Sequence, residues 1–392
     1  MDKNTFKLTK QMVIILSAMI GIGLVALAFG YFGAPSGKRV AANLLLNSYY
    51  FLSLGLVGLF FTTVHAISES GWHLTVSRIS EAMASFIPVG GVILLLFFLM
   101  GGLHLIYEWT DEAHLDALLL KKVAYLNVPF FYVRTIIFLV AWAVLAHFIR
   151  KTSQQIDIDG DLKYFHRLRT LSAVFIVFYA LTSVVSSWDW LMSIDAHWFS
   201  TLYGWYVFSS MLASGTALII LILFFLQRVG YMQHVNKEHL HDLSKYLFGF
   251  SIFWAYLWFS QYMLIWYANI PEETVYYYVR HQHYNGVFYV NIVLNFLIPF
   301  LLLMTRNAKR TYTLLVPVAA LIFVGHWVDL YLMITPGAVG NTDSSIGFLE
   351  IGVTIGFLGL FLLATLYSLS KAPLVSKKHP FYKESLHYHT NY

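Results

Sequence analysis

Residues 186–200 read SSWDWLMSIDAHWFS and join two long apolar runs of the chain. Two aspartates and one histidine stand here among three tryptophans and a phenylalanine. Tryptophan side chains commonly flank bilayer-spanning helices, and aspartate is favoured at the start of a helix. The stretch therefore predicts a short polar connection at a membrane surface, between two transmembrane helices.

The composition around this stretch is that of an integral membrane protein. Of the 392 residues, 58% are hydrophobic and 11% are charged, whereas soluble domains carry about a quarter charged residues. The formal charge of +5 comes from basic residues that flank apolar runs, so no nucleic-acid partner is expected. Because the chain has no cysteine, it cannot hold disulfides, thiolate-ligated iron–sulfur clusters or covalent c-type haem.

Ten apolar runs are long enough to cross a bilayer, which takes about 20 residues per helix. The first run exceeds the apolar core of a signal peptide, about 7–15 residues, and is expected to remain as a span. The runs are continuous rather than alternating, so we predict an all-α integral membrane protein with one polytopic domain. The spans are expected near 11–33, 44–66, 88–107, 128–149, 168–188, 200–227, 243–267, 286–305, 311–333 and 345–369.

The lysines and arginines divide unequally between the two sides of these spans. Of the 25, Arg134 lies within a span and most of the others lie on the side of both termini. The exceptions are Lys38, Arg39, Lys121, Lys122 and Arg280. Because cytoplasmic loops carry the excess of basic residues, we expect both termini in the cytoplasm, including the polar tail at 371–392.

The ends of the fifth and ninth spans resemble each other. One reads SSWDWLMSID (186–195) and the other GHWVDLYLMITP (325–336), each with Trp and Asp before a Leu-Met step. Because the two lie four spans apart, they indicate a parallel repeat of two four-helix bundles. The bundles are expected at 44–188 and 200–333, with the first and last spans outside them.

Polar side chains within membrane spans are costly to bury and usually functional. Most fall toward the outer side, in the spans or the adjoining loops: His104, Arg134, Asp189, Asp195, His197, Gln261, Asn269, Glu272, Glu273, His326, Asp329 and Glu350. Fewer fall toward the inner side, as candidates for a proton path: His65, His147, Tyr179 and Asn295. The candidate chemistry is therefore expected to open outward.

This outer group has the side chains that a quinol head group or a proton path needs. Histidine and carboxylate accept protons, and Asp329 with His326 are the expected acceptors. Trp188 and Trp190 are the candidate walls of a ring slot. Structural roles compete with these: helix caps for Asp189 and Asp195, pairing of Arg134 with Asp189 or Asp329, hydrogen bonds for His104 and His326, and a helix start for Glu350.

Three longer stretches resemble one family of respiratory membrane subunits. They are SSWDWLMSIDAHWFSTLYGWYVF (186–208), HDLSKYLFGFSIFWAYLWFSQYMLIWYANIPEET (241–274) and HWVDLYLMITP (326–336). They are similar to the ActF subunits of alternative complex III, a bacterial quinol:cytochrome c oxidoreductase, within the membrane-anchor superfamily typified by NrfD and the polysulfide reductase anchor. The resemblance covers nearly all ten spans. It implies two four-helix bundles plus peripheral helices in a bacterial inner membrane.

The resemblance also implies partners, ligands and site positions. Expected partners are an ActC-like membrane subunit, multihaem and monohaem c-type cytochromes, an iron–sulfur subunit and lipids, with a terminal oxidase as a further candidate. Haem and iron–sulfur clusters would belong to these partners, whereas quinone or menaquinone would be a non-covalent ligand of this chain. The matching positions are Asp189, Asp195, His197, Gln261, Asn269, Glu272, Glu273, His326 and Asp329.

Two other functions stay open on the sequence. A stand-alone secondary transporter would also have many spans and a repeat, although no span is plainly broken near its middle by paired Gly and Pro. A purely structural anchor would use its outer acids to dock extrinsic proteins. Changes at Asp329 and His326 separate these functions, because a quinol or proton role loses turnover in an assembled complex and an anchor role does not.

Overall fold

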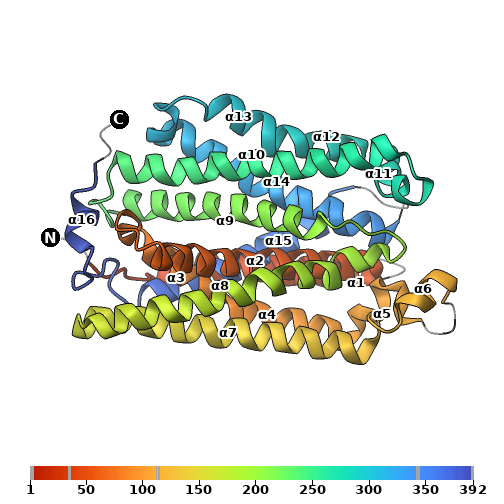
Figure 1. Cartoon of the computed structure of the whole chain (residues 1–392), viewed down its shortest axis with the longest axis horizontal. Helices are drawn as coiled ribbons and strands as arrows, with labels where there is room; N and C mark the ends of the chain where they lie inside the picture. Colours follow the sequence, from red (N-terminus) through yellow and green to blue (C-terminus); the bar gives the residue numbers. More distant parts are fainter. Residues whose placement is uncertain (1–3, 34–36, 112, 114, 341–344, 390–392) are drawn as a thin grey trace.

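The computed structural model describes residues 4–33, 37–111, 113, 115–340 and 345–389. Ten helices in this part of the chain are long and apolar enough to cross a membrane. They run side by side along the long axis of the molecule (Figure 1). The predicted all-α membrane protein with ten spans is therefore confirmed.

The spans follow the predicted order along the chain. The spans are α1 (Lys10–Gly33), α2 (Lys38–Ile67), α3 (Ser77–Met83) with α4 (Ile87–Phe97) and α5 (Leu103–Ile106), α7 (Val128–Asp159), α8 (Leu162–Trp190), α9 (Tyr203–Arg228), α10 (Lys237–Ala268), α12 (Asn285–Ile292) with α13 (Ile298–Leu302), α14 (Tyr312–Val339) and α15 (Phe348–Leu369). The connections include α6 (Ala117–Lys122), α11 (Pro271–His283) and α16 (Tyr382–Leu386).

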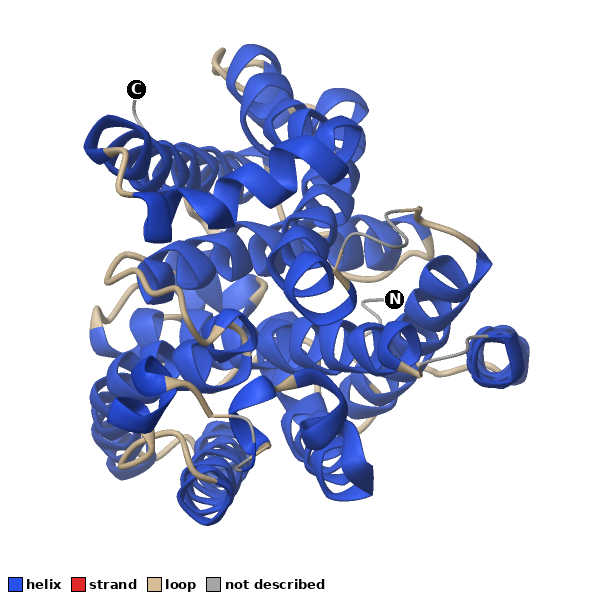
Figure 2. Ribbon diagram, turned by 90° about the vertical axis from the view of Figure 1, so that its right-hand side faces the viewer, coloured by secondary structure: helices blue, strands red, loops and turns tan. Residues whose placement is uncertain are grey.

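The two ends of this helix array carry different segments. Residues 4–9 and 371–389, with α16, lie at one end, which we call the terminal face (Figure 1). The opposite end, which we call the distal face, carries α6 and α11. Figure 2 looks along the helices and shows them nearly end-on.

The contacts between the spans can be described as two groups of four helices. In the first group, α2 packs on α3, α4 and α8, and α7 packs on α4 and α8. In the second group, α9 packs on α10 and α14, while the α12–α13 span packs on α10 and α14. Helix α2 also contacts α9 and α14, so it joins the two groups, and α1 lies against α15 outside them.

The third span begins at Ser77, well before the predicted start at 88. Its first turns are buried although they carry Arg78 and Glu81. These two side chains pair at 2.5 Å, and Arg78 also pairs with Asp157 of α7. Because these charges are compensated inside the protein, the helix continues where the hydropathy pattern indicates a loop.

Helices α1 and α15 approach closely through small residues. A Cβ added to Gly23 would lie 2.6 Å from the Gly356 Cα, and one added to Gly352 would lie 2.5 Å from the Ala26 Cβ. Small residues four apart allow two helix backbones to meet in a membrane, where close packing drives association. The contact between α1 and α15 therefore depends on these positions having almost no side chain.

We expect Gly356→Leu to separate α1 from α15 and to lower the unfolding midpoint of the detergent-purified protein. Overpacking of a close contact costs about 1–3 kcal/mol. Gly21→Leu on α1 is the matched control, because a Cβ at Gly21 meets no atom within 4 Å. Equal midpoints for the two variants in a thermal unfolding assay would contradict the proposed contact.

Candidate functional site

Asp329 lies at the centre of the second helix group and is fully buried. Its carboxylate accepts four hydrogen bonds from side chains on the other three spans of that group. The donors are Tyr206 Oη and Ser210 Oγ (2.9 Å) on α9, Trp254 Nε1 (2.8 Å) on α10 and Asn291 Nδ2 (2.8 Å) on α12. We call these residues, with His326 and Asn295, the Asp329 cluster.

The local sequence explains how these side chains meet. Tyr206 and Ser210 are four residues apart, and His326 and Asp329 are three apart, so each pair lies on one helix face. All four donors to the carboxylate are uncharged side chains. Asp329 is thus held by neutral dipoles, and no lysine or arginine among the described residues forms an ion pair with it.

His326 is the titratable neighbour of Asp329 in this cluster. Its Nδ1 lies 2.9 Å from Ser210 Oγ and 4.0 Å from Asp329 Oδ2. Because Ser210 donates its single hydroxyl proton to Asp329, the His326 Nδ1–H must be the donor to Ser210. The lone pair of neutral His326 is then on Nε2, which is buried and has no hydrogen-bond partner in the described part of the chain.

Asn295 joins this cluster although the sequence placed it toward the inner side. Its Nδ2 donates to Asn291 Oδ1 at 2.6 Å, within the π-helical turn Val293–Leu297. Such turns often occur at functional sites because they re-aim side chains. Gly325 leaves the necessary space, since a Cβ there would lie 2.3 Å from Asn295 Oδ1.

A small cavity lies between the Asp329 cluster and the distal face. Its volume is about 20 Å³, which admits roughly one water molecule. Tyr206 and Asn291 line its inner part, and Gln261 and Tyr277 line it as well. Gln261 donates to Tyr277 Oη (3.0 Å) and accepts from Ser200 (3.3 Å), which is half-buried at the distal face.

Arg280 closes the distal side of this cavity, and sequence reasoning did not single it out. It is buried and pairs with Asp195 at 3.1 Å. Its Nε also donates to the Leu332 carbonyl at 2.9 Å. That carbonyl lacks its usual helical donor because residue 336 is a proline. The signal in the sequence was Pro336, because a proline in a helix leaves the carbonyl four residues earlier for a side chain to satisfy.

Asp189 occupies the corresponding place in the first helix group but has a charged partner. Arg134 Nε and Nη2 contact its two carboxylate oxygens at 2.6 and 3.1 Å. The guanidinium also lies over the rings of Tyr125 and Phe130. The structural alternative for Arg134 is thus the one that the geometry favours, and Asp189 is an ion-paired carboxylate.

The two tryptophans expected as ring walls lie in the first group, away from Asp329. Trp190 is buried, donates from Nε1 to Thr135 (3.0 Å) and packs on Trp142. Trp188 is half-buried. They form part of the packed interior of the first group.

The other outer candidates lie apart from the Asp329 cluster. His197 forms an exposed pair with Asp116 at 2.8 Å, and Glu350 pairs with Arg39 at 2.7 Å. Asn269 ends α10 in the left-handed conformation, where asparagine is favoured. The remaining positions are exposed or half-buried: His104 on α5, and Glu272 and Glu273 in the first turn of α11.

The inner-side candidates lie in separate places. His65 lines a pocket at the terminal face, whereas His147 is exposed on α7 beside a different cavity. Tyr179 lines a cavity of about 10 Å³ within the first group, and Asn295 belongs to the Asp329 cluster. Across the described residues, no hydrogen bond joins any two of these four.

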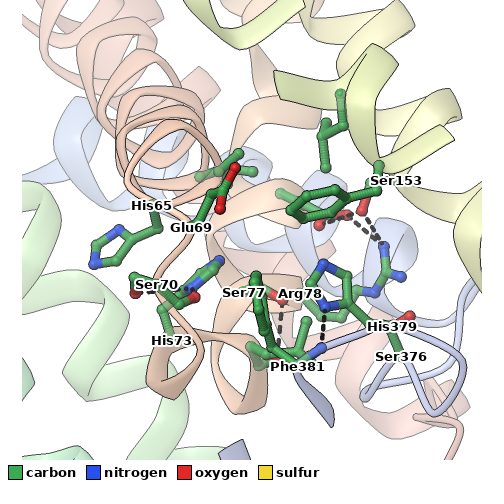
Figure 3. A pocket seen from close by; sticks show the side chains of 16 residues that line it. His65, Glu69, Ser70, His73, Ser77, Arg78, Ser153, Ser376, His379 and Phe381 are labelled. Carbon is green, nitrogen blue, oxygen red and sulfur yellow. Dashed lines mark hydrogen bonds and ion pairs between the residues drawn. The ribbon is translucent and has the colours of Figure 1, made fainter. Parts of the chain in front are cut away.

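The pocket at the terminal face holds a second polar group (Figure 3). The His65 and His73 rings stack with centroids 4.7 Å apart on one side of it. Arg78 and Ser153 lie on the other side, and Ser153 donates to Glu81 at 2.7 Å. The cavity has room for about one water, at 20 Å³. Its ion pairs and its position favour a structural role in fixing the terminal face.

Residues 371–389, which we call the C-terminal strap, cover this pocket. Ser385 Oγ donates to the Trp72 carbonyl at 3.2 Å, and Tyr388 Oη donates to Asp242 at 2.6 Å. His379 of the strap lines the pocket beside Arg78. Burial lowers the pKa of His379 to about 4. Burial, together with His65, lowers the pKa of His73 well below its ordinary value.

We expect the strap to loosen in acid. Both histidines bind protons more readily in the unfolded state, so their contribution to stability is lost as pH falls from about 6.5 toward about 4. Hydrogen exchange at residues 371–389 should therefore be faster at about pH 5 than at about pH 7.5. In His73→Gln/His379→Asn the acceleration should shrink, and an undiminished response would contradict this explanation.

Neither the known family models nor the curated proteins contain a match to this chain. The choice of Asp329 as the candidate site therefore follows from its geometry. It is a carboxylate enclosed by four spans and held by neutral donors, and the nearby His326 Nε2 has no hydrogen-bond partner within the described ranges.

Proposed function

We propose that this chain is a membrane subunit of a bacterial quinol:cytochrome c oxidoreductase of the alternative complex III type, and that its Asp329 cluster exchanges protons with the outer side. The three sequence stretches that resemble ActF subunits support the type of complex. The unequal distribution of basic residues supports a cytoplasmic terminal face and an outer distal face. Partner subunits would hold the haems and iron–sulfur clusters.

The observation that carries the proton role is the way in which Asp329 is held. Its carboxylate is buried, accepts four hydrogen bonds from uncharged donors and forms no ion pair with a lysine or arginine among the described residues. Buried carboxylates within membrane spans often belong to proton relays. His326 Nε2 adds a second buried atom that can accept a proton.

The cavity beside the cluster supports a route to the outer side. From Asp329 to the end of α14 at Val339 is ten residues, about 15 Å of helix. One water in the cavity would bridge Tyr206 and Asn291 to Gln261 and Tyr277. Gln261 in turn contacts Ser200 at the distal face. Proton exchange would thus use the hydroxyl and amide groups of this chain.

The same cavity argues against quinol binding at Asp329. Ligand pockets measure about 300–1,000 Å³, whereas this cavity measures about 20 Å³. A quinone ring does not fit between these side chains. We therefore assign proton exchange to the Asp329 cluster and place the oxidation of quinol with a partner such as the ActC-like subunit.

The hydrogen bonds do not favour a proton path across the whole membrane. Toward the terminal face, Tyr50 Oη contacts Ser214 Oγ at 2.5 Å, one helical turn beyond Ser210. Ser53 is the next buried polar residue on α2, and the one after it, Thr62, lies nine residues further, about 13 Å. Within the described residues no side-chain hydrogen bond joins Ser53 to Thr62, so we propose exchange with one side.

The experiment that tests the type of complex is purification of this chain from its native membrane in a mild detergent. Mass spectrometry and haem spectra then identify what accompanies it. Co-purification of c-type cytochromes and an iron–sulfur protein is the expected result. Recovery of the chain alone and without haem would contradict the proposal and favour a stand-alone transporter.

A further inference from the structure

We propose that a groove between α7 and α15, at the terminal-face end of the membrane, binds an acidic phospholipid. The groove has a volume of about 560 Å³, which lies within the range of ligand pockets, about 300–1,000 Å³. It lies apart from the Asp329 cluster and shares no lining residue with it. The inference is therefore independent of the proposed proton role.

The walls of the groove are apolar and are made largely of small residues. Ala143 and Ala146 line it from α7, Ala364 lines it from α15, and Pro88 and Val89 line it from α4. Pro88 and Val89 are exposed side chains within the apolar third span. The alanines at these wall positions leave space that larger side chains would fill. An acyl chain could therefore enter this apolar part of the groove from the bilayer interior.

Three cations gather at one end of the same groove. Arg150 and Lys151 follow the apolar part of α7, and Lys371 follows the end of α15. Arg150 and Lys151 lie about two helical turns beyond Ala143, about 10–12 Å along the helix axis. This spacing places the cations at the level of lipid head groups when the alanines are at the level of acyl chains.

The charges of the groove are unbalanced. No acidic residue lines it, and none of the three cations forms an ion pair among the described residues. Arg150 Nη2 donates to the Ser368 carbonyl at 2.9 Å, which fixes the guanidinium at the groove. Lys371 lies over the Tyr367 ring. Basic pockets between spans on the cytoplasmic side recognise anionic head groups.

Together these features specify a phosphodiester with attached acyl chains rather than a free phosphate. The cations provide the charge that complements an anionic phosphate, and Ser85 and Gln154 line the groove with further hydrogen-bonding groups. A water-soluble anion would leave the alanine-lined, apolar part of the groove unfilled. A zwitterionic phospholipid would fill the hollow but would gain less from the three cations.

The test is native mass spectrometry of the full-length chain, purified in neutral detergent and supplied with phosphatidylglycerol or phosphatidylcholine. We expect preferential retention of phosphatidylglycerol. In Arg150→Gln/Lys151→Gln/Lys371→Gln its affinity should fall at least about tenfold, because each basic residue near a lipid surface contributes appreciably. The matched control is Arg167→Gln/Lys237→Gln/Lys377→Gln, which removes three exposed cations outside the groove and should retain phosphatidylglycerol as the wild type does.

A second variant tests the hollow itself. Ala143→Phe keeps every cation but fills the apolar part, so it should also lose phosphatidylglycerol. Equal loss in the charge variant and its control would overturn the proposal, as would equal retention of phosphatidylcholine. Displacement of phosphatidylglycerol by inorganic phosphate would point instead to a simple anion site. A photo-crosslinker at Val89 that captures a protein rather than lipid in native membranes would assign the groove to a subunit contact.

Discussion

Replacing Asp329 with Asn is expected to lower the quinol:cytochrome c turnover of the assembled complex by at least about tenfold, since positioned proton-transfer groups contribute about 10²–10⁴ in rate. Asparagine has nearly the same shape as aspartate and keeps one acceptor oxygen for Tyr206, Ser210 or Trp254. It cannot take up and release a proton. The fold should therefore remain while proton exchange is lost.

Glu350→Gln is the matched control for this result. Glu350 is also a buried carboxylate, but it is held by Arg39 and Asn43 and does not contact the Asp329 cluster. Its turnover should stay near that of the wild type. If Asp329→Asn fails to assemble, His326→Gln tests the proton role independently, because it removes the second proton acceptor and should also lower turnover. Normal turnover in an assembled Asp329→Asn or His326→Gln complex would contradict the proton role.

Replacing Asp189 with Asn is expected to affect stability rather than proton exchange, and to lower the free energy of unfolding by a large amount. The change leaves the Arg134 guanidinium buried without its carboxylate partner, at a cost of about 3–5 kcal/mol. Its contacts with the rings of Tyr125 and Phe130 offset a part of that cost. Thermal unfolding of the purified protein in detergent measures the difference.

The double variant Arg134→Gln/Asp189→Asn checks that the loss comes from the unpaired charge. Two neutral amides can hydrogen-bond to each other, and removal of both charges also removes the desolvation cost of the pair. The double variant should regain most of the stability lost in Asp189→Asn. A double variant as unstable as the single one would mean that the ion pair is not what holds this position.

Much of the fold could be predicted because membrane spans are long and apolar. Each span can be recognised from its own apolar run, and the distribution of basic residues indicates on which side of the membrane each loop lies. The third span was predicted too short because Arg78 and Glu81 pair with each other and with Asp157 inside the protein. A hydropathy pattern records the cost of a charge but not the partner that compensates it.

Only those contacts of the candidate site that lie within a single helix could be predicted from the sequence. The spacing of His326 and Asp329 places both on one face of α14, and the sequence indicates that much. The contacts with Tyr206, Trp254 and Asn291 depend on the rotation and depth of three other helices, which no local pattern specifies. Asn295 was assigned to the inner side by its depth, but the π-helical turn directs it toward Asn291.

The pairing of Asp189 with Arg134 illustrates the same limit. The sequence offered both Asp189 and Asp329 as candidates, because each comes shortly after a tryptophan near the end of a span, and it left open which of them pairs with Arg134. In the structure, Asp189 accepts two hydrogen bonds from an arginine, whereas Asp329 accepts hydrogen bonds from uncharged donors. That difference in partners, rather than any difference in local sequence, separates an ion pair from a candidate proton site.

The central claim is that Asp329 changes its protonation state during turnover. Infrared difference spectra of the native complex, recorded between the oxidised and the quinol-reduced state, detect the C=O stretch of a carboxylic acid directly. We predict a carboxylic acid band in the wild type and in Glu350→Gln that is missing from Asp329→Asn. The same band in Asp329→Asn, or no carboxylic acid band in the wild type, would contradict the claim.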